Sequence, residues 1–252
     1  MSSFIVTLLL AYAVFCILLF ILQRQMIYFP TSEVSVAGVP HIVLDSGEAR
    51  IKVWTLNPHR ERAIIYFGGN AENVAYNVDD FKTMFPAHTV YLVNYRGYGG
   101  SSGSPSESAL YADALLTYDH FSKSHSSVSV MGRSVGSAVA TYLASERDVG
   151  RLLLITPFDS AVSVGKRLYP IFPIGLILQE KLDSKSRADR IEAETMIIGT
   201  KDDEIIPYAN TKALAESFSK TKLTVVELSE VGHNTIQLHP AYEKTVSEFM
   251  NR

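Results

Sequence analysis

Residues 128–144, VSVMGRSVGSAVATYLA, carry the strongest indication of the fold. The stretch begins as a short apolar run, turns at GRSVG (residues 132–136) and continues with helical character. A G-x-S-x-G pattern between a strand and a helix predicts a sharp turn that presents Ser134 at the N-terminus of the helix. Glycines are needed on both sides because larger side chains would collide with neighbouring elements. Ser134 is therefore our candidate nucleophile, and the alternative is an ordinary serine N-cap.

The rest of the chain alternates apolar runs with helical stretches. The other runs that we interpret as strands are HIVL, IKVWTL, RAIIYF, TVYLVNY, RLLLIT, TMIIG and LTVVEL. Their near-continuous apolar character is typical of strands buried on both faces. Helical stretches are expected at residues 72–84, 107–123, 135–147, 210–220 and 241–250. This alternation predicts an α/β fold with a mostly parallel, eight-stranded sheet, helices on both faces, and a site at the C-terminal ends of the strands.

A serine nucleophile needs a general base and a carboxylate that orients that base. Among the seven histidines, His233 lies in the loop that follows the last predicted strand, so it is the candidate base. The loop after TMIIG offers Asp202, Asp203 and Glu204 as acid partners. The order serine, aspartate, histidine along the chain is the order found in α/β-hydrolases.

Two backbone N–H groups are needed to stabilise the oxyanion of an acyl-transfer reaction. The residue after the nucleophile, Val135, is expected to supply one of them. The loop FGGNAEN, residues 67–73, follows the third predicted strand, and its glycines allow the backbone to approach a substrate closely. Asn70 or Gly69 would donate the second N–H group, and we predict Asn70. The alternative is that this loop is a simple strand-to-helix turn.

Cofactor and nucleic-acid chemistry find no support in the sequence. The glycine-rich loop at residues 94–107 fails the dinucleotide-binding spacing, because Ser102 stands where a third glycine is required. No His/Asp/Glu cluster with metal-ligand spacing occurs, so we expect neither a metal nor another cofactor. A formal net charge of −3 without a Lys/Arg-rich block argues against a nucleic-acid partner. Cys16 is the only cysteine, which excludes an internal disulfide.

The N-terminal segment predicts a membrane anchor. Residues 4–22, FIVTLLLAYAVFCILLFIL, contain no charge, no glycine and no proline, and this length can cross the hydrocarbon core as a helix. A cleaved signal peptide or a buried core helix are the alternatives. We therefore divide the chain into an anchor at residues 1–24 and a catalytic domain at residues 25–252. Arg24 alone is a weak signal for a cytoplasmic domain, so the side of the membrane stays open.

One connection is unusually long. Residues 157–188 separate RLLLIT from TMIIG and contain the proline-broken apolar sequence LYPIFPIGLIL. We predict a short lid over the binding cleft near residues 157–188. An ordinary covering helix with a kinked approach is the alternative.

Several motifs together resemble a known family. YRGYGGSSGSPSE, GRSVG, TPFDS, DEIIP and GHN occur in this order, after an uncharged span followed by QMIYFPT. In this respect the chain resembles the membrane-anchored α/β-hydrolases that include lysophospholipid lipases and protein depalmitoylases. The resemblance covers almost the whole chain. It implies an α/β-hydrolase fold, Ser134 as nucleophile, His233 as base, an aspartate of KDDE as acid, and ester or thioester substrates.

The chain departs from the family pattern in two places. Gly68 stands where the family has a histidine in the oxyanion loop, so we expect a looser loop and modest activity. The acid loop is one residue longer than the pattern: counting from the strand selects Asp202, whereas counting back from Pro207 selects Asp203. We predict Asp203, because Pro207 begins the next helix and fixes the backbone before it. The neighbouring carboxylate should face solvent, since two adjacent carboxylates are costly to bury together.

The sequence therefore predicts a serine hydrolase that cleaves a carboxylic ester or thioester, of an acyl lipid or a small acyl compound, through an acyl-enzyme. A serine peptidase and a catalytically silent, membrane-tethered binding module are the alternatives. The expected partners are the acyl substrate and the membrane. The acyl length and the oligomeric state are left open.

Overall fold

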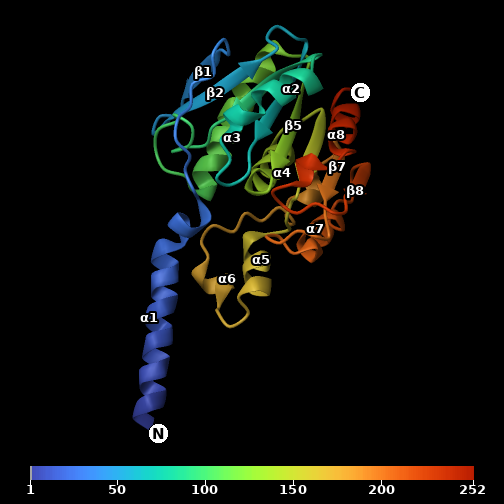
Figure 1. Ribbon diagram of the computed structural model, residues 1–252. Coiled ribbons are helices and arrows are strands. Elements are labelled where there is room, and N and C mark those ends of the chain that lie inside the picture. Colours follow the sequence, from blue (N-terminus) through green and yellow to red (C-terminus); the bar gives the residue numbers. More distant parts are fainter. Residues whose placement is uncertain (1) are drawn as a thin grey trace.

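An eight-stranded sheet organises residues 2–252, which are the residues that the computed structural model describes (Figure 1). The strand order is β1-β2-β4-β3-β5-β6-β7-β8. The strands are β1 (His41–Asp45), β2 (Arg50–Leu56), β3 (Arg62–Phe67), β4 (His88–Val93), β5 (Ser127–Arg133), β6 (Arg151–Ile155), β7 (Glu194–Gly199) and β8 (Leu223–Glu227). The β1–β2 and β2–β4 pairs are antiparallel, and every pair from β4 to β8 is parallel. The predicted mostly parallel, eight-stranded sheet is confirmed.

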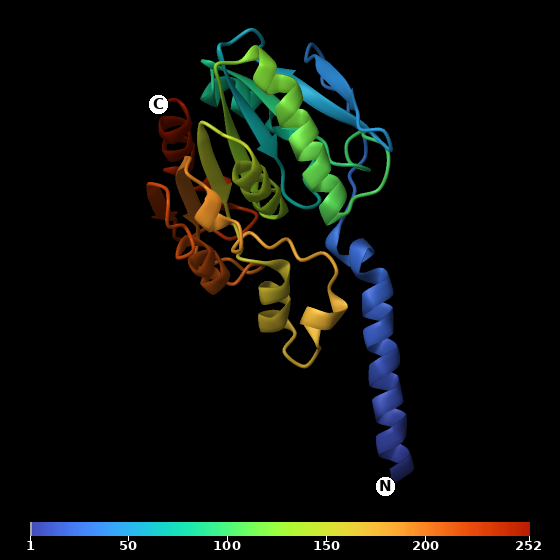
Figure 2. The same ribbon diagram turned by 180° about the vertical axis from the view of Figure 1, so that it is seen from behind.

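Helices cover both faces of the sheet, as the continuous apolar strands predicted (Figure 2). They are α2 (Val78–Met84), α3 (Glu107–Phe121), α4 (Val135–Glu146), α7 (Tyr208–Ala215) and α8 (Tyr242–Met250). Successive side chains of β3 point to opposite faces: Ala63, Ile65 and Phe67 join the apolar core on the side of α3 and α4, and Ile64 and Tyr66 join the core on the side of α2 and α8. Burial on both faces explains why β3 shows no polar alternation.

Helix α2 begins later than the sequence predicted. The expected stretch started at residue 72, but residues Val74–Asn77 form a 3₁₀ turn and α2 starts at Val78. The side-chain oxygen of Asn73 accepts a hydrogen bond from the N–H of Ala75 at 3.2 Å and so caps this turn. The turn leaves the preceding residues free to form a loop at the end of β3.

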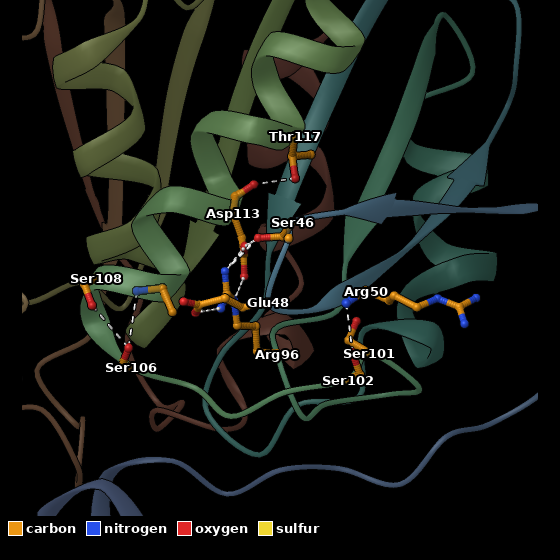
Figure 3. Close-up of polar contacts among 12 residues, drawn as sticks. Ser46, Glu48, Arg50, Arg96, Ser101, Ser102, Ser106, Ser108, Asp113 and Thr117 are labelled. Carbon is orange, nitrogen blue, oxygen red and sulfur yellow. Dashed lines mark hydrogen bonds and ion pairs between the residues drawn. The ribbon is translucent and has the colours of Figure 1, made fainter.

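The glycine-rich loop between β4 and α3 is held in place by a buried ion pair (Figure 3). Arg96 donates from Nε to Asp113 Oδ2 at 2.7 Å and from Nη2 to Asp113 Oδ1 at 2.9 Å. Both side chains are buried, and Ser46 Oγ bonds to both of them. The hydrogen bonds to Asp113 raise the pKa of the Arg96 guanidinium above its ordinary value. This motif therefore has a structural explanation: a two-point contact fastens the loop to α3 and to the chain after β1.

Helix α1 (Ser2–Ile27) extends away from the sheet (Figures 1 and 2). The short helix α6 (Ile174–Ile177) lies beside it, and α5 (Ala161–Leu168) packs on the other side of α6. Residues 3–27 form the one helix among the described residues that is long and apolar enough to cross a membrane. Most of its large apolar side chains are exposed, so it is not a buried core helix. The predicted lid segment contains α5 and α6 followed by extended chain, and its role as a lid stays a prediction.

Candidate active site

Ser134 lies on the sharp turn between β5 and α4. Its backbone has φ 51° and ψ −117°, which is a strained conformation for a residue with a side chain. A Cβ atom on Gly132 would lie 2.2 Å from the carbonyl oxygen of Gly136, and one on Gly136 would lie 2.0 Å from that of Phe67. The N–H of Ser134 donates to Ile155 O of β6 at 2.9 Å. The two glycines thus have the steric role that the sequence predicted, and the turn directs Ser134 to the C-terminal edge of the sheet.

His233 lies between Ser134 and an aspartate. Its Nε2 is 3.0 Å from Ser134 Oγ, and its Nδ1 is 2.7 Å from Asp203 Oδ2. The side chains of His233 and Asp203 are only 5% and 3% exposed, so water competes little for these bonds. The tautomer that makes both bonds carries its proton on Nδ1, which donates to Asp203, and leaves Nε2 to accept from Ser134.

The two adjacent aspartates face different partners. Asp203 Oδ1 accepts from the N–H groups of Ile205 at 2.9 Å and Ile206 at 2.6 Å, while its Oδ2 faces His233. Asp202 is exposed, and its Oδ2 accepts from the N–H of Glu230 at 3.0 Å. The loop therefore brings Asp203, and not Asp202, to the histidine, and two backbone N–H groups fix the orientation of the Asp203 carboxylate.

Glu204 holds the loop that carries the histidine. Its Oε2 accepts a hydrogen bond from the N–H of His233 at 2.9 Å. A Cβ atom on Gly232 would lie 2.3 Å from the same oxygen. A side chain on residue 232 would therefore require the Glu204 carboxylate to move.

The residues predicted to form an oxyanion hole belong to helix α4 and to the loop after β3, in which a Cβ atom on Gly69 would lie 3.7 Å from Ser134 Cβ. Val135 is the first residue of α4, and Asn70 follows Gly69 in the loop after β3. Gly69 N donates to Glu72 Oε2 at 2.6 Å, so this N–H is already occupied and Asn70 is the better candidate of the two. The Asn70 side chain is itself fixed, because its Nδ2 donates to Ile27 O at 2.6 Å.

The sequence prediction of a loose oxyanion loop does not match the structure. A Cβ atom on Gly68 would lie 2.7 Å from Val74 Cγ1 and 3.2 Å from Glu72 Cδ, so Glu72 lies where a side chain on residue 68 would begin. The Glu72 carboxylate accepts from Gly69 N, and also from Tyr66 Oη at 2.7 Å. Burial and the charge of Glu72 raise the pKa of Tyr66 well above its ordinary value, so this hydroxyl remains a donor. Hydrogen bonds to Glu72 therefore brace this loop, and we call this arrangement the brace of the oxyanion loop.

Arg133, the residue before the nucleophile, connects this brace to the histidine loop. Its Nη1 is 3.6 Å from Glu72 Oε2, and its Nη2 donates to His233 O at 3.2 Å. Asn77 Nδ2 donates to the other Glu72 oxygen at 2.6 Å. Neither Glu72 nor Arg133 was identified from the sequence. The available signals were an acidic residue in the predicted oxyanion loop, Glu72, and a basic residue directly before the candidate nucleophile, Arg133.

The side chains around Ser134 are arranged as acyl transfer requires. No group of three or more His, Cys, Asp or Glu side chains within residues 2–252 is placed to hold a metal ion. A hydroxyl, an imidazole and a carboxylate are in hydrogen-bond contact, beside a helix N-terminus that favours negative charge. Chemically, such a group can activate the hydroxyl and stabilise an oxyanion.

Comparison with known proteins identifies the family. An uncharacterized protein of Mycobacterium tuberculosis is 31% identical over 232 residues, which cover 86% of this chain and 82% of that protein. The alpha/beta hydrolase domain-containing protein aho-3 of Caenorhabditis elegans is 28% identical over 203 residues, covering 77% of this chain and 59% of that protein. The chain belongs to the α/β-hydrolase family. No family model matches the sequence of this hydrolase.

Other relatives and solved structures agree with this assignment. An uncharacterized membrane protein of Saccharomyces cerevisiae is 26% identical to this hydrolase over 231 residues, covering 84% of this chain and 80% of that protein. The Pyrococcus furiosus esterase Pf2001 superposes with a TM-score of 0.69 at 15% identity, covering 89% of this chain and 98% of that one. Est1E from Butyrivibrio proteoclasticus, with ferulic acid bound, gives a TM-score of 0.68 at 16% identity, covering 83% and 98%. These structures share the fold of this hydrolase.

Proposed function

We propose that this protein is a serine hydrolase that cleaves carboxylic ester or thioester bonds. The single observation that carries the proposal is the continuous hydrogen-bond chain from Ser134 through His233 to Asp203. Its members come from three separate loops at the C-terminal edge of the parallel sheet, where sites of open α/β sheets lie. The Pyrococcus furiosus protein that shares the fold is named an esterase, which is consistent with the proposal.

In the proposed mechanism, Ser134 Oγ attacks the carbonyl carbon while His233 Nε2 takes its proton, and Asp203 orients and stabilises the imidazolium. The N–H groups of Val135 and Asn70 hold the oxyanion of the tetrahedral intermediate. The intermediate collapses, and His233 returns the proton to the leaving alcohol or thiol. Water, deprotonated by His233, then attacks the acyl-enzyme, which releases the acid and restores the Ser134 hydroxyl.

We further propose that residues 1–24, of which Met1 lies outside the described residues, anchor the domain of residues 25–252 as a single membrane span. The length and apolar character of α1 support this proposal, as does the name of the yeast relative, a membrane protein. The parts of segment 157–188 that adjoin the sheet would then cover the site as a short lid. The substrate class that fits this arrangement is an acyl lipid or a small acyl ester.

The mechanism is tested by labelling the full chain in detergent micelles with a fluorophosphonate probe, which reacts with activated serines. Wild type should be labelled and Ser134→Ala should not. Ser219→Ala removes the hydroxyl of an exposed serine and serves as the matched control, which should be labelled like wild type. Equal labelling of wild type and Ser134→Ala contradicts the mechanism. Absence of both labelling and ester turnover in wild type favours a catalytically silent binding module.

A further inference from the structure

The hairpin formed by α5, α6 and the loop between them, residues 161–177, runs alongside the apolar helix α1. Both views show it extending away from the sheet on the same side as α1 (Figures 1 and 2). It follows β6, whose last residue, Ile155, accepts a hydrogen bond from the N–H of Ser134. The hairpin therefore starts close to the candidate nucleophile and ends beside the proposed membrane span.

The tip and the base of this hairpin contact α1 at two different positions along the helix axis. At the tip, Tyr12 Oη donates to Ile171 O at 2.7 Å, and the rings of Tyr12 and Phe172 stack with centroids 5.9 Å apart. At the base, Gln23 Nε2 donates to Ile177 O at 3.1 Å. Tyr12 and Gln23 are 11 residues apart, or about 16 Å along the helix axis. The tip therefore reaches roughly half of the ~30 Å depth of a hydrocarbon core beside α1.

Residues 168–176 of the hairpin expose large apolar side chains. Leu168, Tyr169, Ile171 and Leu176 have exposed fractions of 46%, 57%, 73% and 84%. These four large side chains lie within nine residues of sequence, and Phe172, within the same stretch, packs against Tyr12 and Phe15 of α1. An apolar patch that is continuous with a membrane span calls for the same environment as that span.

The charges of the hairpin suit the surface of a bilayer. Residues 160–179 contain no Asp or Glu, and their two charged residues are Lys166 and Arg167 in the last turn of α5. Both are exposed, and neither forms an ion pair with any residue of the described chain 2–252. Long basic side chains beside an apolar tip can extend to the phosphates of the headgroup layer while the tip enters the acyl chains.

Non-helical backbone is tolerated in a membrane only where its polar groups have partners. In the tip, Phe172 N donates to Tyr169 O at 3.1 Å and Ile174 N donates to Phe172 O at 2.8 Å. Tyr12 of α1 supplies the donor for Ile171 O. The tyrosine in the middle of the span thus satisfies a loop carbonyl that would otherwise face lipid.

We propose that residues 168–177 form a second membrane-embedded element. This element is docked on α1 and inserted into the leaflet that lies next to the catalytic domain. The partner of this surface is the lipid bilayer. Because the hairpin connects the leaflet to the edge of the sheet that carries Ser134, the substrate is an ester whose acyl chain reaches the site from the membrane rather than from water. The inference rests on the proposed anchoring by α1 and on the proposed hydrolase mechanism. The experiment tests the hairpin insertion, the anchor and the mechanism separately.

The test measures the depth of a nitrobenzoxadiazole fluorophore on single cysteines of the full chain, reconstituted in phosphatidylcholine–phosphatidylglycerol vesicles. The native Cys16 reports on α1. Ile171→Cys and Leu176→Cys, each in a Cys16→Ser background, report on the hairpin at two independent sites. Leu238→Cys in the same background is the matched control, because Leu238 is 72% exposed and lies outside both elements.

The two hairpin positions and Cys16 should lose their emission to lipids that carry a nitroxide in the acyl chain and be protected from aqueous iodide. Position 238 should show the reverse. If Cys16 responds to the lipid nitroxide but the hairpin positions respond to iodide, the hairpin is an aqueous lid and the inference fails, while the anchor stands. Response of Cys16 to iodide removes the anchor as well, and protection of the hairpin from both quenchers indicates a protein contact instead of lipid. Fluorophosphonate labelling of each variant reports separately on the proposed mechanism.

Discussion

The carboxylate of Glu72 connects the oxyanion loop to the strand before the nucleophile, so its replacement by an isosteric amide tests how the site is held together. One Glu72 oxygen accepts from Tyr66 and Asn77, and the other accepts from Gly69 N and lies 3.6 Å from Arg133. The Glu72→Gln variant keeps the shape of the side chain but has one acceptor oxygen and no charge. Whichever way the amide is turned, an N–H₂ group faces hydrogen-bond donors.

The size of the effect follows from these bonds. A hydrogen bond to a charged group contributes about 1.5–3 kcal/mol and a neutral one about 1 kcal/mol, so Glu72→Gln should lower the free energy of unfolding by about 1–3 kcal/mol. Loss of an oxyanion-hole donor lowers kcat by about 10²–10³-fold. Because the variant loosens the loop without removing the donor, we expect kcat/KM to fall by about 10–100-fold, mainly through kcat.

The assay is turnover of a short p-nitrophenyl ester by the full chain in detergent micelles, together with thermal unfolding. Glu243→Gln is the matched control, because Glu243 is an exposed glutamate in the first turn of α8. It should change neither quantity. Wild-type kcat/KM with a lower melting temperature would make Glu72 purely structural, and wild-type values of both would refute the reasoning.

Three further predictions concern the acid, the glycine-rich loop and a buried histidine. Asp203→Asn should lower ester turnover by about 10⁴-fold, whereas Asp202→Asn should stay close to wild type; the reverse order would move the acid role to Asp202. Asp113→Asn leaves the buried Arg96 guanidinium with the exposed Glu48 carboxylate, 3.3 Å away, as its remaining acidic partner. It should lower the free energy of unfolding by about 3–5 kcal/mol, seen as an earlier thermal transition. Burial lowers the pKa of His88 to about 4, so the unfolded chain takes up this proton first, near pH 6.5. The stability contributed by neutral His88 is therefore complete above about pH 6.5 and lost as the pH falls toward 4; the melting temperature of His88→Gln should depend less on pH in this window, and equal slopes would contradict this account.

The α/β fold could be predicted from the sequence because its signals are local. A strand buried on both faces, such as Arg62–Phe67, has to be apolar along its length, and this pattern is visible without knowing its neighbours. The turn at Ser134 needs Gly132 and Gly136 because no Cβ atom fits there, and both glycines lie within five residues of each other. His233 was found by its position after the last strand.

The acid loop shows where local spacing stops being sufficient. Counting along the chain supported Asp202 from one side and Asp203 from the other. In the folded chain, Asp202 accepts from the backbone of Glu230 while Asp203 faces His233, from which it is 30 residues distant in sequence. The direction of each carboxylate is decided by loops that meet only after folding.

Glu72 and the hairpin contacts had no comparable pattern in the sequence. The partners of Glu72 come from β3, from the turn before α2 and from the end of β5, and Tyr12 meets Ile171 across 159 residues. Steric exclusion and burial constrain residues that are close in sequence, so they produce patterns that can be recognised in the sequence. A hydrogen bond between distant segments depends on how whole strands and helices pack, so residue spacing alone could show neither the brace of the oxyanion loop nor the docking of the hairpin on α1.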